Sequence, residues 1–325
     1  MRDVLDCVLL LALPASGKSE VRRYLRWLPA EECRRDFHMG PTVQLDDYPY
    51  VHMMRRIDDE LAALGNDRIF FHAPDRPFKD TRDWGTLIWL LNEDYDNLIR
   101  RAPVSGPAAP WLFARLDAAA GRVGLPARLG ALNPATREAL AARLEKEALD
   151  LREDLVKGYP DTLEGKTLVV EFARGGPQGA SFPLPGCYGY AYSLSQLHPK
   201  ILEKASILYV WVTPEESRRK NFERADPNNP GSILHHGVPL EVMLNDYGCD
   251  DMEWLEKASG EPGFIHVDAG GRKYTIPVAR FDNRVDKTSF LRKDPKEWPK
   301  EAVNAVHTGL KQALDALFER RRKLA

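Results

Sequence analysis

The chain has 325 residues, of which 43% are hydrophobic and 29% are charged, and its 46 basic and 48 acidic residues leave a formal net charge of −2. This composition is ordinary for a globular protein and excludes wholesale disorder. The charge balance argues against a long nucleic-acid-binding surface, although it allows a local basic site.

The N-terminus and the cysteines bear on the compartment. Arg2, the apolar stretch after it and the small residues at 12–15 imitate a short signal peptide, but Asp3 and Asp6 lie where positive charge is wanted. The longest apolar run, 7–15, is shorter than the roughly 20 residues of a membrane span. The four cysteines form no CxxC pair, which disfavours a disulfide framework and a structural zinc site. We therefore expect a cytoplasmic protein without a membrane partner.

Short apolar strands alternate with helices along the chain. Residues 4–13 predict a buried strand that runs into a loop at 14–17, and residues 19–28 place their apolar side chains on one helical face. Further strands are predicted at 42–45, 167–172, 207–212 and 276–281, and a hairpin joins 264–267 to 273–275. This alternation indicates an α/β fold with a mostly parallel sheet covered on both faces.

Three helical segments are predicted around this sheet within a single domain, 1–325. The region 108–154 is rich in Ala, Leu and Arg without a strand pattern, which indicates a helical insertion. Thr213, Pro214 and Glu216 predict a capped helix, and the loop after it completes a small lid over 213–236. A helix over 301–324 ends the chain, and its basic end suits a helix C-terminus.

Residues 12–19 (ALPASGKS) match the phosphate-binding loop pattern, with Ala12 in place of the first glycine. Successive backbone N–H groups can curl around phosphate oxygens in such a loop, and the next helix directs its positive end at the anion. The residues expected to bind the nucleotide are Pro14, Ala15, Ser16, Gly17, Lys18 and Ser19. Lys18 would reach the terminal phosphates, and Ser19 would place its hydroxyl on Mg²⁺. The alternative is a chance small-residue turn before a helix.

An acid pair, Asp46 and Asp47, follows the second predicted strand. An acid at this place can reach the point of phosphoryl transfer as a base that accepts the proton of a substrate hydroxyl. The alternative is a pair of turn aspartates before Pro49.

With these motifs the sequence resembles the P-loop kinase superfamily, in particular the branch of uridine kinase, pantothenate kinase and phosphoribulokinase. The resemblance implies a three-layer sandwich, ATP and Mg²⁺. Residues 46–50 (DDYPY) look like the family's aspartate–aromatic motif, with Asp46 at the base position and Asp47 and Tyr48 beside the acceptor. The segment 71–75 is similar to the family's His/Asp segment that borders the acceptor, which implicates His72; ordinary loop residues are the alternative.

The same resemblance assigns roles to residues after the later strands. Glu171, at the end of the third core strand, would lie near the Mg²⁺ shell, and Arg174 could contact phosphate or substrate. A buried carboxylate is costly without a partner, which also favours a function for Glu171. In such kinases the helix after the next strand carries lid arginines, here Arg218, Arg219 and Arg224; a solvated basic face is the alternative. His235 and His236 lack a third metal ligand nearby and are expected to be structural or surface residues.

These observations predict an ATP- and Mg²⁺-dependent kinase that acts on a hydroxyl group of a small molecule, such as a nucleoside-like metabolite. Two other functions stay open. One is a regulatory ATPase or interaction protein in which ATP orders the lid; the other is a nucleic-acid end kinase, which the near-neutral charge disfavours. The sequence identifies neither the acceptor nor the oligomeric state.

Overall fold

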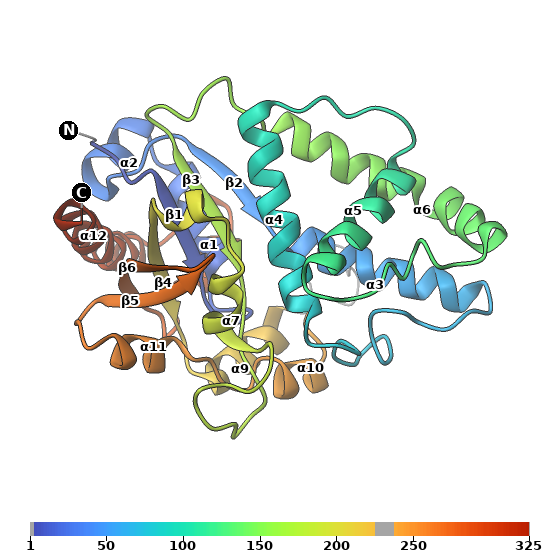
Figure 1. The fold of residues 1–325 in the computed structure, drawn as a ribbon. Coiled ribbons are helices and arrows are strands. Elements are labelled where there is room, and N and C mark those ends of the chain that lie inside the picture. Colours follow the sequence, from blue (N-terminus) through green and yellow to red (C-terminus); the bar gives the residue numbers. More distant parts are fainter. Residues whose placement is uncertain (1–2, 225–236, 325) are drawn as a thin grey trace.

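The computed structural model describes residues 3–224 and 237–324, so the predicted lid loop, His235 and His236 lie outside the described residues. A six-stranded sheet has the order β2-β3-β1-β4-β6-β5, in which every neighbouring pair is parallel except β5 and β6 (Figure 1). The strands are β1 (Cys7–Leu11), β2 (Thr42–Asp46), β3 (Thr167–Phe172), β4 (Ala205–Trp211), β5 (Phe264–Ala269) and β6 (Arg272–Asp282). The predicted strands and the hairpin are thus confirmed to within a few residues, except that 273–275 and 276–281, predicted as separate strands, are one strand, β6.

The helices occupy most of the chain between the strands. Their bounds are α1 (Lys18–Trp27), α2 (Ala30–Phe37), α3 (Tyr48–Ala63), α4 (Asp83–Arg100), α5 (Ala108–Arg122), α6 (Pro134–Lys157), α7 (Gly189–Ser195), α8 (Pro199–Leu202), α9 (Pro214–Arg224), α10 (Leu240–Asn245), α11 (Met252–Ser259) and α12 (Lys300–Lys323), with short 3₁₀ helices η1 (Ser289–Arg292) and η2 (Pro295–Glu297). The cap of α9 agrees with the sequence, because the Thr213 hydroxyl accepts a hydrogen bond from the Glu216 amide at 3.1 Å.

Helices cover both faces of this sheet because the strands are apolar on both sides. Leu9 and Leu11 of β1 face a core shared with α4, α7 and α11, whereas Val8 and Leu10 face a core shared with α1, α2 and α12. Figure 1 shows α2 and α12 on one side of the sheet and α4 on the other. The expected α/β class with a mostly parallel, doubly covered sheet is therefore what the structure has.

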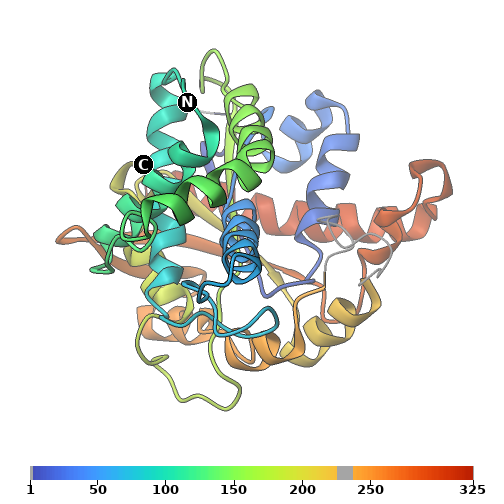
Figure 2. The same cartoon turned by 90° about the vertical axis from the view of Figure 1, so that its right-hand side faces the viewer.

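The region predicted as a helical insertion consists of α5 and α6. Together with α3 and α4 they enclose a second apolar core, to which Leu112, Leu116, Leu140 and Leu144 contribute fully buried side chains. In Figure 2 these four helices lie in front of the sheet. The same core includes Phe71, Trp84 and Tyr247, and it therefore extends to the edge of the sheet where polar residues gather. Within the described ranges, no helix has the length and apolar character needed to cross a bilayer.

Candidate functional site

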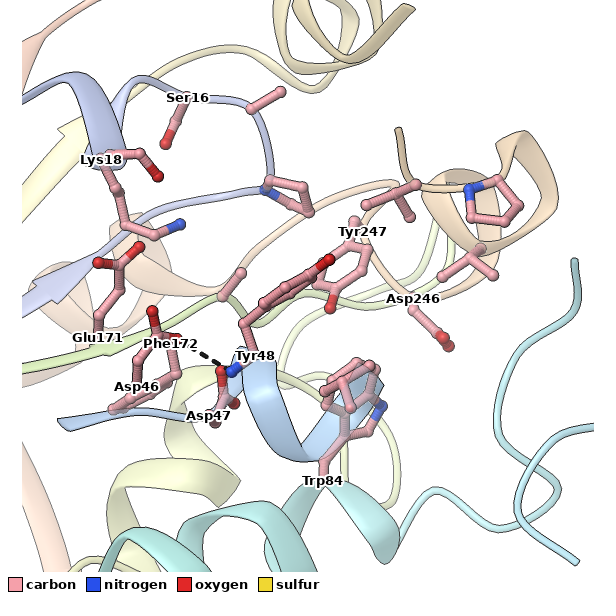
Figure 3. Close-up of a pocket in the computed structure, with 18 of the residues that line it drawn as sticks. Ser16, Lys18, Asp46, Asp47, Tyr48, Trp84, Glu171, Phe172, Asp246 and Tyr247 are labelled. Atoms are coloured by element: carbon pink, nitrogen blue, oxygen red, sulfur yellow. Dashed lines mark hydrogen bonds between the residues drawn. The ribbon is translucent and has the colours of Figure 1, made fainter. Parts of the chain in front are cut away.

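One cavity lies at the edge of the sheet where β1, β2 and β3 end. Because these strands are parallel, their carboxyl ends and the segments that follow them meet there. The cavity offers about 1000 Å³ of space, open solvent at its mouth included. The lining residues come from the loop after β1 and the start of α1, from the end of β2 and α3, from the segment before α4 and its start, from the end of β3, and from α10 and its flanks (Figure 3). They are Pro14, Ala15, Ser16, Gly17, Lys18, Ser19, Glu20, Asp46, Asp47, Tyr48, Val51, Arg55, Phe71, Phe78, Trp84, Glu171, Phe172, Ala173, Val238, Pro239, Val242, Asp246 and Tyr247.

The loop between β1 and α1 has the conformation of an anion-binding nest. Ala15 and Gly17 adopt positive φ angles of 54° and 107°, and α1 begins directly after them at Lys18. The backbone N–H groups of Ala15, Ser16 and Gly17 donate to no other residue in the described part of the chain. The Ser16 hydroxyl is also buried without a hydrogen-bond partner there. Buried donors cost free energy when they lack acceptors, and an anion that entered this loop would supply acceptors for them.

Lys18 is buried beside this loop. Its Nζ atom donates to the carbonyl oxygens of Ala12, at 3.3 Å, and Leu13, at 3.4 Å. Both bonds are long, and carbonyls are weaker partners for an ammonium group than phosphate oxygens. The Lys18 side chain therefore has a stronger partner available if an anion enters the loop.

Two carboxylates and one arginine stand next to Lys18. Asp46 and Glu171 are paired across β2 and β3, and Arg22 of α1 approaches both, with Nη1 at 3.3 Å from Asp46 Oδ2 and 2.8 Å from Glu171 Oε2. Burial, together with the charge of Asp46, raises the pKa of Glu171 to about 7. Arg22 and the nearby Lys18 ammonium oppose this shift, so the two carboxylates share two positive charges, and both carboxylates line the cavity.

Asp47 also lines the cavity and is tied to Arg174. Arg174 is 1% exposed; its Nη1 lies 2.6 Å from Asp47 Oδ2, and its other N–H groups donate to Ser193, Ala173 and Trp84. Burial raises the pKa of Asp47, although Arg174 opposes this shift. Arg174 therefore pairs with Asp47 inside the protein and does not line the cavity. This corrects the expectation that Arg174 contacts phosphate or substrate.

The far half of the cavity is aromatic. Phe71, Phe78, Trp84 and Tyr247 pack edge-on or stacked against one another, and Figure 3 places Trp84 and Tyr247 on the side away from Lys18. Two charged groups also lie here. Arg55 stacks on Phe71 with its guanidinium 3.9 Å from the ring centre and donates to the backbone carbonyls of 74 and 76.

The second charged group of this half is Asp246, which is 2% exposed. Burial raises its pKa to about 7, and the charge of Arg55 and a hydrogen bond from Tyr188 offset this only in part. The described residues place no ion-pair partner within 4 Å of Asp246. No signal in the sequence marks this residue, because Asp246 lies in a polar stretch without a motif and reaches the cavity only through the packing of α10.

Three other sequence-predicted residues, His72, Arg218 and Arg219, lie outside the cavity lining. His72 is exposed, and its neighbours Phe71 and Phe78 line the cavity instead. Arg219 is 46% exposed and pairs with Glu216 and Glu223 on its own helix, as on a solvated face. Arg218 is partly buried, with Glu215 at 3.2 Å. Arg224 ends α9, and its side chain lies outside the described residues.

The cavity suits a hard divalent cation better than zinc. Its candidate ligands are all oxygen atoms, from the hydroxyls of Ser16 and Ser19 and the carboxylates of Asp46 and Glu171, and oxygen ligands are those that Mg²⁺ prefers. The residues present therefore fit the expected Mg²⁺. Comparisons with protein-family models, with curated proteins and with solved structures find no match for this chain, so the interpretation of the site rests on its own geometry.

Proposed function

We propose that the protein is an ATP- and Mg²⁺-dependent phosphotransferase that acts on a hydroxyl group of a small molecule. The observation that carries the proposal is the placement of the loop N–H groups at 15–17, Lys18 and two strand-end carboxylates in one cavity with an aromatic second half. The resemblance to the uridine kinase, pantothenate kinase and phosphoribulokinase branch supports it from the sequence side.

Each part of the proposed reaction has a residue suited to it. The N–H groups at 15–17 and Lys18 hold the phosphates of ATP. Asp46 accepts the proton of the acceptor hydroxyl while the hydroxyl oxygen bonds to the γ-phosphorus; the bond from that phosphorus to the β,γ-bridging oxygen breaks, and ADP leaves. Ser19 and Glu171 would hold Mg²⁺, which supplies charge neutralisation at the phosphates when bound. Positioning and electrostatic stabilisation then provide most of the catalysis.

The aromatic half defines the acceptor in this proposal. Flat rings such as Trp84 and Tyr247 favour a planar group, and a buried carboxylate such as Asp246 favours hydrogen-bond donors on that group. A hydroxylated molecule with a ring, of which a nucleoside is one example, fits both features better than a simple polyol. An enclosed cavity of this kind also favours a small acceptor over a nucleic-acid end.

The experiment is to measure ADP release from ATP with and without a pool of small hydroxylated metabolites, for the wild type and for Lys18→Ala. The proposal expects ATP binding and an acceptor-dependent rise in turnover in the wild type, and loss of both in Lys18→Ala. Lys146→Ala is the control, because Lys146 is an exposed lysine of α6 that pairs with Asp150 on the same helix. ATP binding without transfer to any member of the pool would favour the regulatory function, and unchanged ATP affinity in folded Lys18→Ala would refute the nucleotide site.

A further inference from the structure

Two carbonyl groups of the 12–17 loop accept hydrogen bonds from side chains that do not belong to the cavity lining. The Ser217 hydroxyl, on α9, donates to the Pro14 carbonyl at 2.7 Å, and the Asn283 amide, just after β6, donates to the Ser16 carbonyl at 2.7 Å. Both donors are fully buried. Neither side chain lines the cavity.

Because the peptide is planar and trans, these two hydrogen bonds also fix the directions of two N–H groups, those of Ala15 and Gly17. In a trans peptide the C=O and the following N–H point in opposite directions. The carbonyl of Pro14 shares its peptide plane with the N–H of Ala15, and the carbonyl of Ser16 shares its plane with the N–H of Gly17. A carbonyl held away from the cavity therefore directs the paired N–H toward it.

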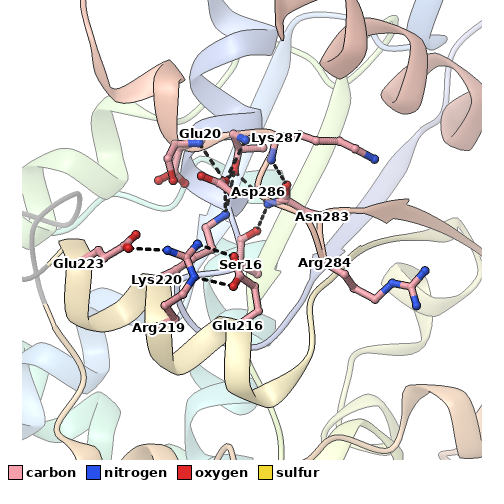
Figure 4. Close-up of polar contacts among 12 residues, drawn as sticks. Ser16, Glu20, Glu216, Arg219, Lys220, Glu223, Asn283, Arg284, Asp286 and Lys287 are labelled. Atoms are coloured by element: carbon pink, nitrogen blue, oxygen red, sulfur yellow. Dashed lines mark hydrogen bonds and ion pairs between the residues drawn. The ribbon is translucent and has the colours of Figure 1, made fainter.

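A buried polar network contacts Asn283 directly and holds α9, the helix that carries Ser217 (Figure 4). Asn283 also donates to the Thr288 hydroxyl at 2.9 Å, and the Lys220 ammonium lies 2.7 Å from Asp286 and 3.2 Å from the Thr288 hydroxyl. Lys220 and Ser217 are one turn apart on α9, so the network joins that helix to the 283–288 segment behind the loop.

The fit of this network around Gly17 is tight. A Cβ atom at Gly17 would lie 2.5 Å from the Thr288 hydroxyl oxygen and 2.9 Å from the Asn283 amide nitrogen. Both distances are too short for a side chain, and the φ of 107° disfavours one in any case. The segment 283–288 therefore packs directly on the peptide whose N–H it orients.

We propose that Ser217 and Asn283 are positioning residues for phosphate, each of which aims one loop N–H, of Ala15 and Gly17 respectively, into the cavity. The inference rests on the proposed function, because it assigns those two N–H groups to a polyphosphate. The inference adds a role for α9 that does not depend on the arginines of this helix, because Ser217 in its first turn takes part in phosphate binding.

The test uses inorganic tripolyphosphate as the probe and follows the backbone amide signals of protein labelled with ¹⁵N-alanine and ¹⁵N-glycine. In the wild type, tripolyphosphate should shift the amides of both Ala15 and Gly17. Ser217→Ala should lose the Ala15 shift and keep that of Gly17, while Asn283→Leu should do the reverse. Each variant should bind tripolyphosphate about tenfold more weakly, as expected when one charge-assisted hydrogen bond loses its orientation.

Matched controls separate this role from a general loss of stability. Ser195→Ala removes a hydroxyl that donates to a backbone carbonyl at 2.7 Å, and Asn92→Leu removes a buried amide that donates to one at 2.8 Å, both far from the loop. Neither should change the probe affinity or the two amide shifts.

The outcomes also separate the inference from the proposed function. The inference is overturned if Ser217→Ala and Asn283→Leu bind tripolyphosphate with wild-type affinity and show the wild-type shifts of both amides. It is also overturned if folded Ser217→Ala loses the Ala15 and Gly17 shifts together. Should Asn283→Leu fail to fold, Ser217→Ala alone decides. If each variant loses only its own amide shift on probe binding, but the wild type transfers no phosphoryl group from ATP to the pool, the inference is supported and the regulatory function is favoured over the kinase function. A wild-type chain that binds no polyphosphate would overturn both.

Discussion

Replacing Lys220 by methionine should destabilise the protein by about 3 kcal/mol. Lys220 is 0% exposed and pairs with Asp286, whose side chain is 26% exposed. Removing one partner of a buried ion pair costs about 3–5 kcal/mol, because the other charge is left uncompensated. We expect the lower end of this range, since Asp286 keeps hydrogen bonds from the backbone amides of Thr288 and Ser289.

The effect should also depend on pH. Burial alone would raise the pKa of Asp286, but hydrogen bonds from Lys220 and Ser289 outweigh it and hold this pKa well below its usual value of 3.8. A carboxyl with a lowered folded-state pKa contributes stability above its unfolded pKa and loses it as the pH falls. The cost of Lys220→Met should therefore shrink as the pH is lowered from 7 toward 3, where the lone carboxylate can take up a proton.

Urea unfolding of wild type and variants at pH 7 and pH 4 measures this. Lys146→Met is the matched control, because the Lys146–Asp150 pair is exposed and its loss should leave the unfolding free energy nearly unchanged. The double variant Lys220→Met, Asp286→Asn should recover at least half of the loss, since no buried charge is left alone. A loss below about 1 kcal/mol at pH 7, or a loss that grows on acidification, would refute the reasoning.

Further predictions concern the cavity and α9. Asp46→Asn should lower the rate of phosphoryl transfer roughly 10²–10⁴-fold with ATP affinity nearly unchanged. Steady-state kinetics of Asp46→Asn and Asp47→Asn measure this, and loss of turnover in Asp47→Asn alone would assign the base to Asp47 instead. Replacing Arg219, an exposed residue paired on its own helix, should leave turnover unchanged, whereas Arg218→Ala should lower kcat more than ATP affinity if α9 closes over the phosphates. Burial raises the pKa of Asp246 to about 7, so the wild type loses stability as this carboxyl ionises between about pH 4 and 7. Asp246→Asn should therefore gain stability relative to the wild type over this range, by at most about 4 kcal/mol at 1.4 kcal/mol per pH unit. A difference in urea midpoint between variant and wild type that is the same at pH 5 and pH 8 would contradict this.

Local sequence determined the parts of this protein whose signal is contained in a few consecutive residues. Apolar runs such as 167–172 specify strands wherever they are buried, and a strand followed by ALPASGKS specifies a nest before a helix, since positive φ angles and small residues are local properties. The parallel order of the strands then brings Asp46 and Glu171 to the same edge as Lys18. The strand pattern and the loop motif together therefore suffice to predict that these three residues share one site.

Tertiary packing decided the rest, because the remaining site residues depend on partners far away in the chain. Arg174 follows a strand as a substrate-binding arginine would, yet Asp47, 127 positions earlier, and Ser193 hold it inside the protein. Asn283 lies 267 positions from the Ser16 carbonyl that it holds, and no periodicity links them. A sequence motif specifies the shape of a loop, whereas the direction of its N–H groups is fixed by whichever distant donors occupy its carbonyls, and only the folded chain brings those donors there.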